Sequence, residues 1–99
     1  MKLWLDDLRP APEGYVWCKS VNEAKRIIIW HCGLWGIFDL IDVDHDLGDY
    51  AKDGGDGVKL LDWLEETGRN YPIRIHSANA VGVQNMRRII ERNGWKEVK

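Results

Sequence analysis

Side chains that could hold a metal ion or move protons follow an apolar run at residues 37–43. Asp44, His45 and Asp46 come directly after this run. Burying so many polar groups inside a strand would cost free energy unless each had a partner, whereas at a strand's exit they can face a crevice. We therefore expect a central strand over residues 36–44 that ends in a polar site.

Two other segments carry similar side chains at the ends of expected strands. Asp6 and Asp7 follow a short apolar strand near the N-terminus, and His76 and Ser77 end a later one. Strands that alternate with helices indicate an α/β domain with a mainly parallel sheet. Because ligands in such sheets bind at the carboxyl ends of the strands, we expect these residues to converge with Asp44.

The expected elements place the whole chain, residues 1–99, in one domain. The strands are at 2–5, 15–18, 36–44, 72–77 and 95–98, and the helices are at 21–31, 58–66 and 83–92. This order favours a flavodoxin-like sheet with five strands in the order 2-1-3-4-5 and about three helices. Residues 6–14 are too few for the first crossover helix, which leaves the orientation of the second strand open.

Local signals mark several boundaries of these elements. Ser20 and Glu23 match a capping box before the first helix, and Gly33 supplies its stop. Residues 48–57 contain three glycines among mixed charges and are expected to form a mobile loop beside the site. Residues 78–82 are expected to form a turn before the third helix.

Alternation along two strands indicates an unusual sheet face. Asp42, Asp44 and Asp46 point to one side of their strand, as Arg74 and His76 do on theirs. A parallel strand that is covered by helices on both faces should be apolar on both. One face near the site is therefore expected to be thinly covered.

Three carboxylates at adjacent strand ends indicate a cation site. Asp6, Asp7 and Asp44 would repel one another, and a divalent ion relieves that repulsion. Oxygen ligands suit Mg²⁺ or Mn²⁺, which can also bind a phosphate oxygen. A nitrogen ligand, His45, would extend the choice to Fe, Zn or Ni. The alternative is that Asp6 caps the following turn and Asp7 is solvated.

Two histidines and three neutral or basic residues could complete a phosphate site. His45 and His76 titrate near neutrality and could act as general base and general acid, with Asp46 orienting one of them. The alternative is a structural role for each imidazole. The residues that could hold phosphate oxygens are Arg9, Ser77 and Asn79, which are also ordinary loop residues.

The composition excludes some classes of protein. The net charge is −2 and no run of Lys or Arg stands out, so broad DNA or RNA binding is not expected. No apolar run approaches the ~20 residues of a membrane span, and the N-terminus lacks the apolar region of a signal peptide. Cys18 and Cys32 fit no metal spacing and are expected to be free thiols in a reducing cytoplasm.

The chain resembles the receiver domains of response regulators. Asp6 and Asp7 follow the first strand, Asp44 ends the third, and Ser77-Ala78 ends the fourth. The resemblance implies that the acidic pair and Asp44 bind Mg²⁺, that Asp44 accepts a phosphoryl group, and that Ser77 contacts it.

A closer resemblance is to the cyclic-phosphate-processing receiver domains of bacteria and phages. It is carried by residues 5–10 (Leu-Asp-Asp-Leu-Arg-Pro), 44–48 (Asp-His-Asp-Leu-Gly) and 75–79 (Ile-His-Ser-Ala-Asn), with Gly82 and Met86 after them. It covers nearly the whole chain. The lysine that receivers carry on strand five has no secure counterpart, because Lys96 and Lys99 fall in a very short tail. The two histidines, His45 and His76, have no standard receiver role.

The sequence therefore predicts a metal-dependent phosphoesterase that acts on a cyclic phosphate of a nucleotide or RNA end. Its substrate would be a phosphate-containing small molecule or an RNA end. One alternative is a receiver-type signalling or interaction module in which Asp44 is the phosphoacceptor. The other is a domain that binds a nucleotide without turning it over.

Overall fold

The computed structural model describes residues 1–32 and 38–99. The predicted helix stop at Gly33 and the predicted strand residues Gly36 and Ile37 lie outside these ranges. The strands are β1 (Lys2–Leu5), β2 (Tyr15–Cys18), β3 (Leu40–Val43), β4 (Ile73–Ile75) and β5 (Glu97–Val98), and the helices are α1 (Val21–Cys32), the 3₁₀ helix η1 (Gly48–Lys52), α2 (Val58–Glu66) and α3 (Ala80–Asn93).

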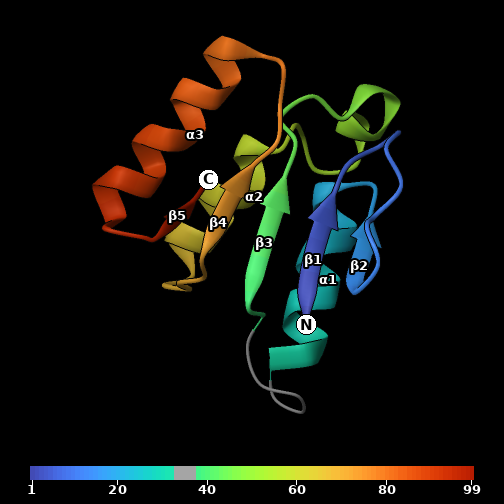
Figure 1. Ribbon diagram of the computed structural model, residues 1–99, viewed down its shortest axis with the longest axis horizontal. Coiled ribbons are helices and arrows are strands. Elements are labelled where there is room, and N and C mark those ends of the chain that lie inside the picture. The colour runs from blue at the N-terminus through green and yellow to red at the C-terminus, as the bar shows by residue number, and fades with distance from the viewer. Residues whose placement is uncertain (33–37) are drawn as a thin grey trace.

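The five strands form one sheet in the order β2-β1-β3-β4-β5 (Figure 1), which confirms the predicted order. Every neighbouring pair is parallel. The second strand is therefore an ordinary parallel edge strand, with Lys2 opposite Tyr15 and Leu5 opposite Cys18. Residues 6–14 join β1 to β2 without a helix, so the predicted loss of the first crossover helix is confirmed.

The three α-helices share one apolar core with a single face of the sheet. In Figure 1 the sheet lies in front of α1 and α2. Successive side chains of a strand point to opposite faces, and only one of the two sets enters the core. That set contributes Leu3, Leu5, Cys18, Ile41, Val43 and Ile73, which join apolar residues of all three α-helices. The domain is thus a two-layer α/β structure.

No α-helix of the described residues contributes to a core on the opposite face of the sheet, which we call the open sheet face. Its strand residues are Lys2, Trp4, Tyr15, Trp17, Leu40, Asp42, Arg74 and Val98, as the strand registers require. None of them belongs to the apolar core. The expectation that one face near the site is thinly covered is confirmed. No described helix is both long and apolar enough to cross a bilayer.

Of the predicted strand over residues 36–44, residues 40–43 form β3, whereas the described residues 38, 39 and 44 do not belong to it. β3 begins at Leu40, which pairs with Lys2, the first residue of β1. Just before it, the Asp39 N–H donates to the Met1 carbonyl oxygen at 2.8 Å, and the Asp39 carboxylate binds the N-terminal ammonium at 2.7 Å. β4 and β5 are likewise shorter than predicted.

The third helix begins at Ala80, three residues before the predicted start. The Asn79 side chain accepts a hydrogen bond from the Gly82 N–H at 2.9 Å. This N-cap satisfies one of the free N–H groups of the first turn, so residues 80–82 are helical and do not form the predicted turn. The predicted loop at residues 48–57 is also wrong in part, because it contains η1.

The predicted capping box before α1 forms with one partner shifted, because Glu23 reaches back to the N–H of Lys19 and not to that of Ser20. Ser20 Oγ accepts a hydrogen bond from the Glu23 N–H at 3.0 Å, and Glu23 Oε1 accepts one from the Lys19 N–H at 2.7 Å. The Ser20 hydroxyl also donates to Asp53 Oδ2 at 2.7 Å. The start of α1 is therefore tied to the segment that follows η1.

Candidate metal centre

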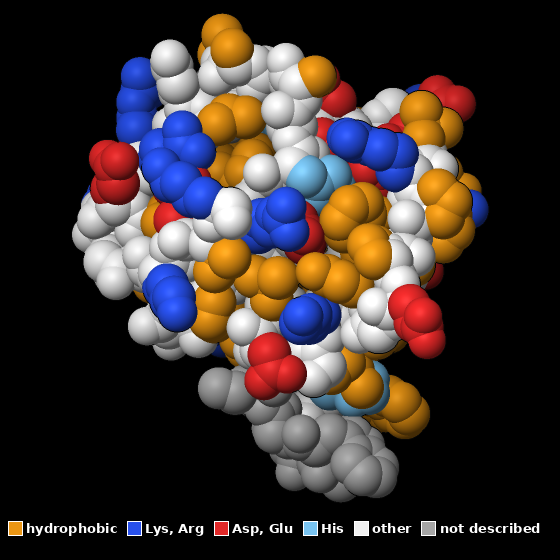
Figure 2. All heavy atoms as spheres, in the orientation of Figure 1, with side chains coloured by type: hydrophobic (Ala, Val, Ile, Leu, Met, Phe, Trp, Pro, Cys, Tyr) orange, Lys and Arg blue, Asp and Glu red, His pale blue; other side chains and the backbone are white. Residues whose placement is uncertain are grey.

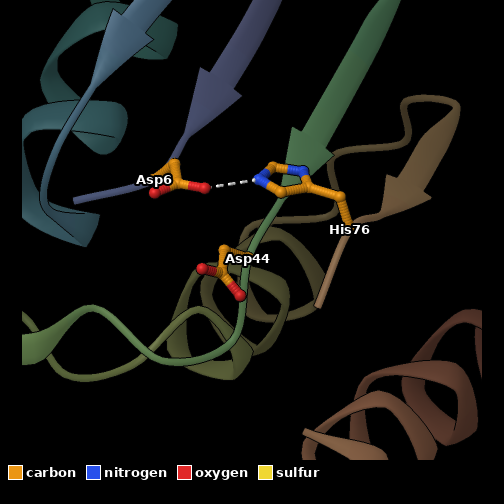
Figure 3. Close-up of side chains that lie close together, drawn as sticks. All are labelled: Asp6, Asp44 and His76. Carbon is orange, nitrogen blue, oxygen red and sulfur yellow. Dashed lines mark hydrogen bonds and ion pairs between the residues drawn. The ribbon is translucent and has the colours of Figure 1, made fainter. Parts of the chain in front are cut away.

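Asp6, Asp44 and His76 converge at the carboxyl ends of β1, β3 and β4 (Figure 3). One ligand atom from each lies within 4.8 Å of the others. Asp6 is 1% exposed and Asp44 is 8% exposed, so the cluster is largely shielded from water. His76 Nε2 lies 3.0 Å from Asp6 Oδ2. The predicted convergence of these three residues is found in the structure.

The loop after β1 holds Asp6 in place. Asp6 Oδ1 accepts hydrogen bonds from the N–H groups of Leu8 and Arg9, each at 2.9 Å. Oδ2 faces His76 and also accepts from Arg9 Nε at 3.0 Å. Burial by itself would raise the pKa of Asp6, but the Arg9 and Leu8 N–H groups and His76 outweigh it and lower that pKa. Asp6 therefore stays ionised next to a second carboxylate.

Asp44 is the electrostatically unfavourable member of the cluster. Burial, followed by the charge of Asp6, raises its pKa, although the Ser77 hydroxyl and the His45 N–H partly oppose this. The His45 N–H donates to Asp44 Oδ1 at 2.8 Å. Arg9 Nη2 reaches Asp44 Oδ2 at 3.5 Å. A cation placed between Asp6 and Asp44 would relieve this repulsion.

The imidazole of His76 is held from two directions. Its Nδ1 lies 2.6 Å from Oδ1 of Asp42, a β3 carboxylate that is 1% exposed. The indole of Trp4 stacks on the ring with the centroids 3.8 Å apart and the planes inclined by 6°. A carboxylate on the distal nitrogen fixes the tautomer and the orientation of an imidazole, as is common for histidines that ligate metals. Asp42 was not among the predicted site residues; its signal was a charge inside a buried strand, in alternation with Asp44.

His45 lies in a second, neighbouring cluster. Its Nδ1 is 2.7 Å from Asp46 Oδ1, and ligand atoms of His45, Asp46 and Asp56 lie within 4.8 Å of one another. The Asn79 amide donates to Asp46 Oδ1 at 3.0 Å. His45 and then Asn79 lower the pKa of Asp46. His45 and His76, predicted to face one phosphate together, thus have separate carboxylate partners.

Gly82 is the residue of α3 that makes room for the His45 ring. A Cβ at this position would lie 2.4 Å from His45 Cγ and 2.6 Å from its Cδ2. Those are distances at which the ring would have to move. The first turn of α3 therefore sets the position of His45, in addition to supplying the Asn79 cap.

Asp7 is the one predicted metal ligand that does not join the first cluster. Its Oδ2 lies beside Gly48, 2.6 Å from where a Cβ would stand on that residue. Gly48 adopts a φ of 55°, so the turn into η1 runs close to the carboxylate. The neighbouring carboxylates of Asp6 and Asp7 thus differ in their surroundings.

The predicted phosphate-binding residues are distributed over both clusters. Arg9 contacts Asp6 and Asp44. The Ser77 hydroxyl forms a hydrogen bond with Asp44 that opposes the rise in the Asp44 pKa. It also accepts a hydrogen bond from the Asn79 N–H at 3.1 Å. Asn79 contacts Asp46 through its side chain. The segment from Ser77 to Asn79 thus links the two clusters.

The donor set of the first cluster fits a divalent metal ion. It offers carboxylate oxygens from Asp6 and Asp44 and an imidazole nitrogen from His76, all converging within 4.8 Å. Carboxylates alone suit Mg²⁺ and Mn²⁺, and the added nitrogen favours a transition metal. Fixed orientation of His76 by Asp42 is the support that a metal ligand needs.

Fold and site together define a receiver-like α/β domain with an acidic, histidine-containing centre at its strand ends. The family model of the cyclic-phosphate processing receiver domain matches residues 1–92. The chain therefore belongs to that family, as the motifs at residues 5–10, 44–48 and 75–79 predicted. No curated protein matches the chain.

Proposed function

We propose that this domain is a metal-dependent phosphoesterase that acts on the cyclic phosphate of a nucleotide or RNA end. The observation that carries the proposal is the convergence of Asp6, Asp44 and His76 within 4.8 Å at three adjacent strand ends. Membership of a cyclic-phosphate processing family agrees with this chemistry. An ordinary receiver needs no imidazole at this place.

Asp6, Asp44 and His76 would hold the metal ion, with Mn²⁺ favoured over Mg²⁺ by the nitrogen ligand. Asp7 remains a further candidate ligand on the family resemblance alone. When bound, such an ion polarises a phosphate oxygen and lowers the pKa of a coordinated water. Ligation through Nε2 would leave the proton on Nδ1 of His76, which would donate it in a hydrogen bond to Asp42 Oδ1, 2.6 Å away.

His45 is the better candidate for proton transfer. Its Nδ1 is taken by Asp46, which sets the tautomer and leaves Nε2 to exchange a proton with the substrate. Asp46 is itself held by Asn79. His76, predicted as the second acid or base, would instead act as a ligand, since both of its nitrogens face carboxylates.

Arg9 and Ser77 would bind the phosphate oxygens. The Arg9 guanidinium lies between the cluster and solvent, with its side chain 58% exposed, and is therefore able to contact an incoming anion. Ser77 lies beside Asp44 and is followed by the N-terminus of α3, whose first N–H groups also favour an anion. Asn79 uses its oxygen to cap this helix.

The test is product formation from a panel of 2′,3′-cyclic and other cyclic phosphates with Mg²⁺, Mn²⁺ or EDTA. We expect turnover that EDTA abolishes and that His45→Ala and His76→Ala each reduce by at least about 100-fold. His31→Ala, in α1, is the matched control and should retain full activity. Turnover that persists in EDTA or in both site variants would refute the proposal.

A receiver-type module with Asp44 as the phosphoacceptor is the second candidate. It is favoured by the sheet order β2-β1-β3-β4-β5 and by the Ser77 hydroxyl beside Asp44. Against it, the cation paired with Asp44 is Arg9, and no lysine of the described residues forms an ion pair with Asp44. Labelling of the protein by a small phosphodonor, lost in Asp44→Asn, would favour this candidate.

A further inference from the structure

The open sheet face gathers positive charge that is dispersed along the sequence. Lys2 and Arg74 project from it, as the strand registers require, and Lys19 and Lys96 flank it directly after β2 and directly before β5. No ion pair within the described residues involves any of these four cations. Asp42, the acid in the middle of the face, is 1% exposed. The exposed acid nearest Lys2 is Asp39, whose carboxylate binds the N-terminal ammonium. A chain of net charge −2 thus places four cations on or beside this face.

Aromatic rings lie between these cations. Trp4 and Tyr15 meet edge to face with their centroids 5.8 Å apart, and Trp17 is 36% exposed. The Lys19 ammonium lies 4.8 Å from the Trp17 ring centroid, and the Lys2 ammonium lies 5.5 Å from that of Tyr15. Figure 2 shows this side of the molecule, where Lys and Arg side chains alternate with hydrophobic ones around a histidine.

This surface is poorly suited to a packed helix. A packed helix would need aliphatic side chains to bury, and the strands offer only Leu40 and Val98 on this face. Leu40 is already buried, with 8% of its surface exposed. Interleaved rings and cations instead match a ligand that has flat aromatic groups joined by negative charges. Single-stranded nucleic acid has this chemistry, since its bases stack on aromatic side chains and its phosphates pair with Lys and Arg.

The open sheet face is also continuous with the metal centre. Trp4 belongs to this face and stacks on His76, a member of the metal cluster. A single-stranded nucleic acid that lies over β1 and β3 would therefore have one end at Asp6 and Asp44. The face spans five parallel strands, about 19 Å across at ~4.8 Å per strand spacing, and sheets of similar width take two or three stacked bases.

We propose that the open sheet face binds single-stranded nucleic acid through stacking on its aromatic residues and pairing with Lys2 and Arg74. The delivery of a terminal phosphate to the metal centre rests on the proposed phosphoesterase function. The binding itself does not, because it involves neither the metal nor the cyclic phosphate. Sequence composition gave no sign of it, since the cations stand far apart in the chain.

The experiment measures fluorescence anisotropy of labelled eight-nucleotide RNA and DNA single strands that carry a 3′-hydroxyl, in EDTA, from 20 to 200 mM salt. We expect binding that is at least about tenfold tighter than that of a hairpin duplex of the same composition. The double variant Lys2→Gln/Arg74→Gln should weaken binding at least tenfold and reduce the salt slope by about 1.4. Tyr15→Leu should weaken it about fivefold with an unchanged slope.

The matched control is Lys59→Gln/Arg88→Gln, which removes two exposed cations from the helix layer and should leave affinity and slope unchanged. Equal losses in the control, equal affinity for the duplex, or no binding at 20 mM salt would overturn the proposal. So would a concentration-dependent dimer in sedimentation that Tyr15→Leu dissociates, because the face would then join two copies of the chain. Since the probe cannot be turned over, binding without activity against cyclic phosphates would refute the phosphoesterase alone.

Discussion

Trp4 and His76 stack face to face, with ring centroids 3.8 Å apart and planes inclined by only 6°. They come from β1 and β4, which are not neighbours, so their rings meet over the intervening strand β3. The β3 residue beneath them is Asp42, which takes the Nδ1 side of the imidazole. The stack therefore buries a carboxylate and aims His76 Nε2 at Asp6.

Replacing Trp4 should loosen the metal centre more than it unfolds the domain. In Trp4→Leu the imidazole loses one wall, and we expect Mn²⁺ affinity to fall about tenfold while stability falls by about 2 kcal/mol. Calorimetric titration and urea unfolding measure the two effects. Trp30→Leu, at an indole 68% exposed on α1, should change neither. Lost stability with unchanged Mn²⁺ affinity would mean that Trp4 only packs.

Asp42 should act as the residue that positions His76. Asp42→Asn keeps the size of the side chain but removes the charge that holds the Nδ1 proton, so we expect Mn²⁺ affinity to fall by about 10- to 100-fold. Nitrogen chemical shifts of His76 should show a mixture of tautomers in the variant and one tautomer in the wild type. Asp62→Asn, on the outside of α2, is the control. An unchanged His76 spectrum would contradict this role.

Asp44 should destabilise the metal-free protein at neutral pH. Burial and then Asp6 raise its pKa, so ionised Asp44 is less favourable in the folded than in the unfolded chain. Asp44→Asn should therefore raise Tm by about 2–5 °C in EDTA. With excess Mn²⁺ the order should reverse, because only the wild type gains stability from binding. A lower Tm for Asp44→Asn in EDTA would refute this account.

In Gly82→Ala, helix propensity and packing should change the stability of the folded protein in opposite directions. Gly→Ala inside a helix usually stabilises by up to about 1 kcal/mol. Here the added Cβ would lie 2.4 Å from His45 Cγ, so we expect Gly82→Ala to lower stability by about 1–2 kcal/mol and to displace His45. Urea unfolding and the His45 ring resonances report the two effects. A stabilised variant with unmoved resonances would show that the ring adjusts freely.

The link between α1 and the segment after η1 should weaken in acid. The Ser20 hydroxyl, followed by the Asn22 amide, lowers the pKa of Asp53 in the folded protein. A folded-state pKa below the unfolded value of about 3.9 contributes stability above that pH, which is lost as the pH falls through the lowered pKa.

Asp53→Asn should therefore flatten the dependence of the urea midpoint on pH between about 2 and 5. The exposed variant Asp49→Asn, in η1, is the control and should keep the wild-type slope. An acid slope that is unchanged in Asp53→Asn would place the acid sensitivity elsewhere, with Asp6 the next candidate because its pKa is also lowered.

Much of the fold was predictable because its signals are local. Apolar runs set the strands, and the Ser20–Glu23 capping box set the start of α1. One error has a local cause, since the Asn79 cap starts α3 three residues before the predicted start. The strand order followed from short connections and parallel pairing, which leave few arrangements of five strands.

The sequence by itself determined which polar residues stand at strand ends, and hence that Asp6, Asp44 and His76 would meet. Only the tertiary structure decided how the polar residues at the strand ends separate into two clusters, one around His76 and one around His45. Strand register puts Asp42 beneath His76, and the first turn of α3 keeps His45 with Asp46. The Asp42–His76 contact joins residues that are 34 positions apart. The His45–Asp46 contact joins sequence neighbours, but the residues that hold it, Asn79 and Gly82, come from the start of α3. The open sheet face has the same origin, because Lys2 and Arg74, which are far apart in the sequence, share one face only when the strands align.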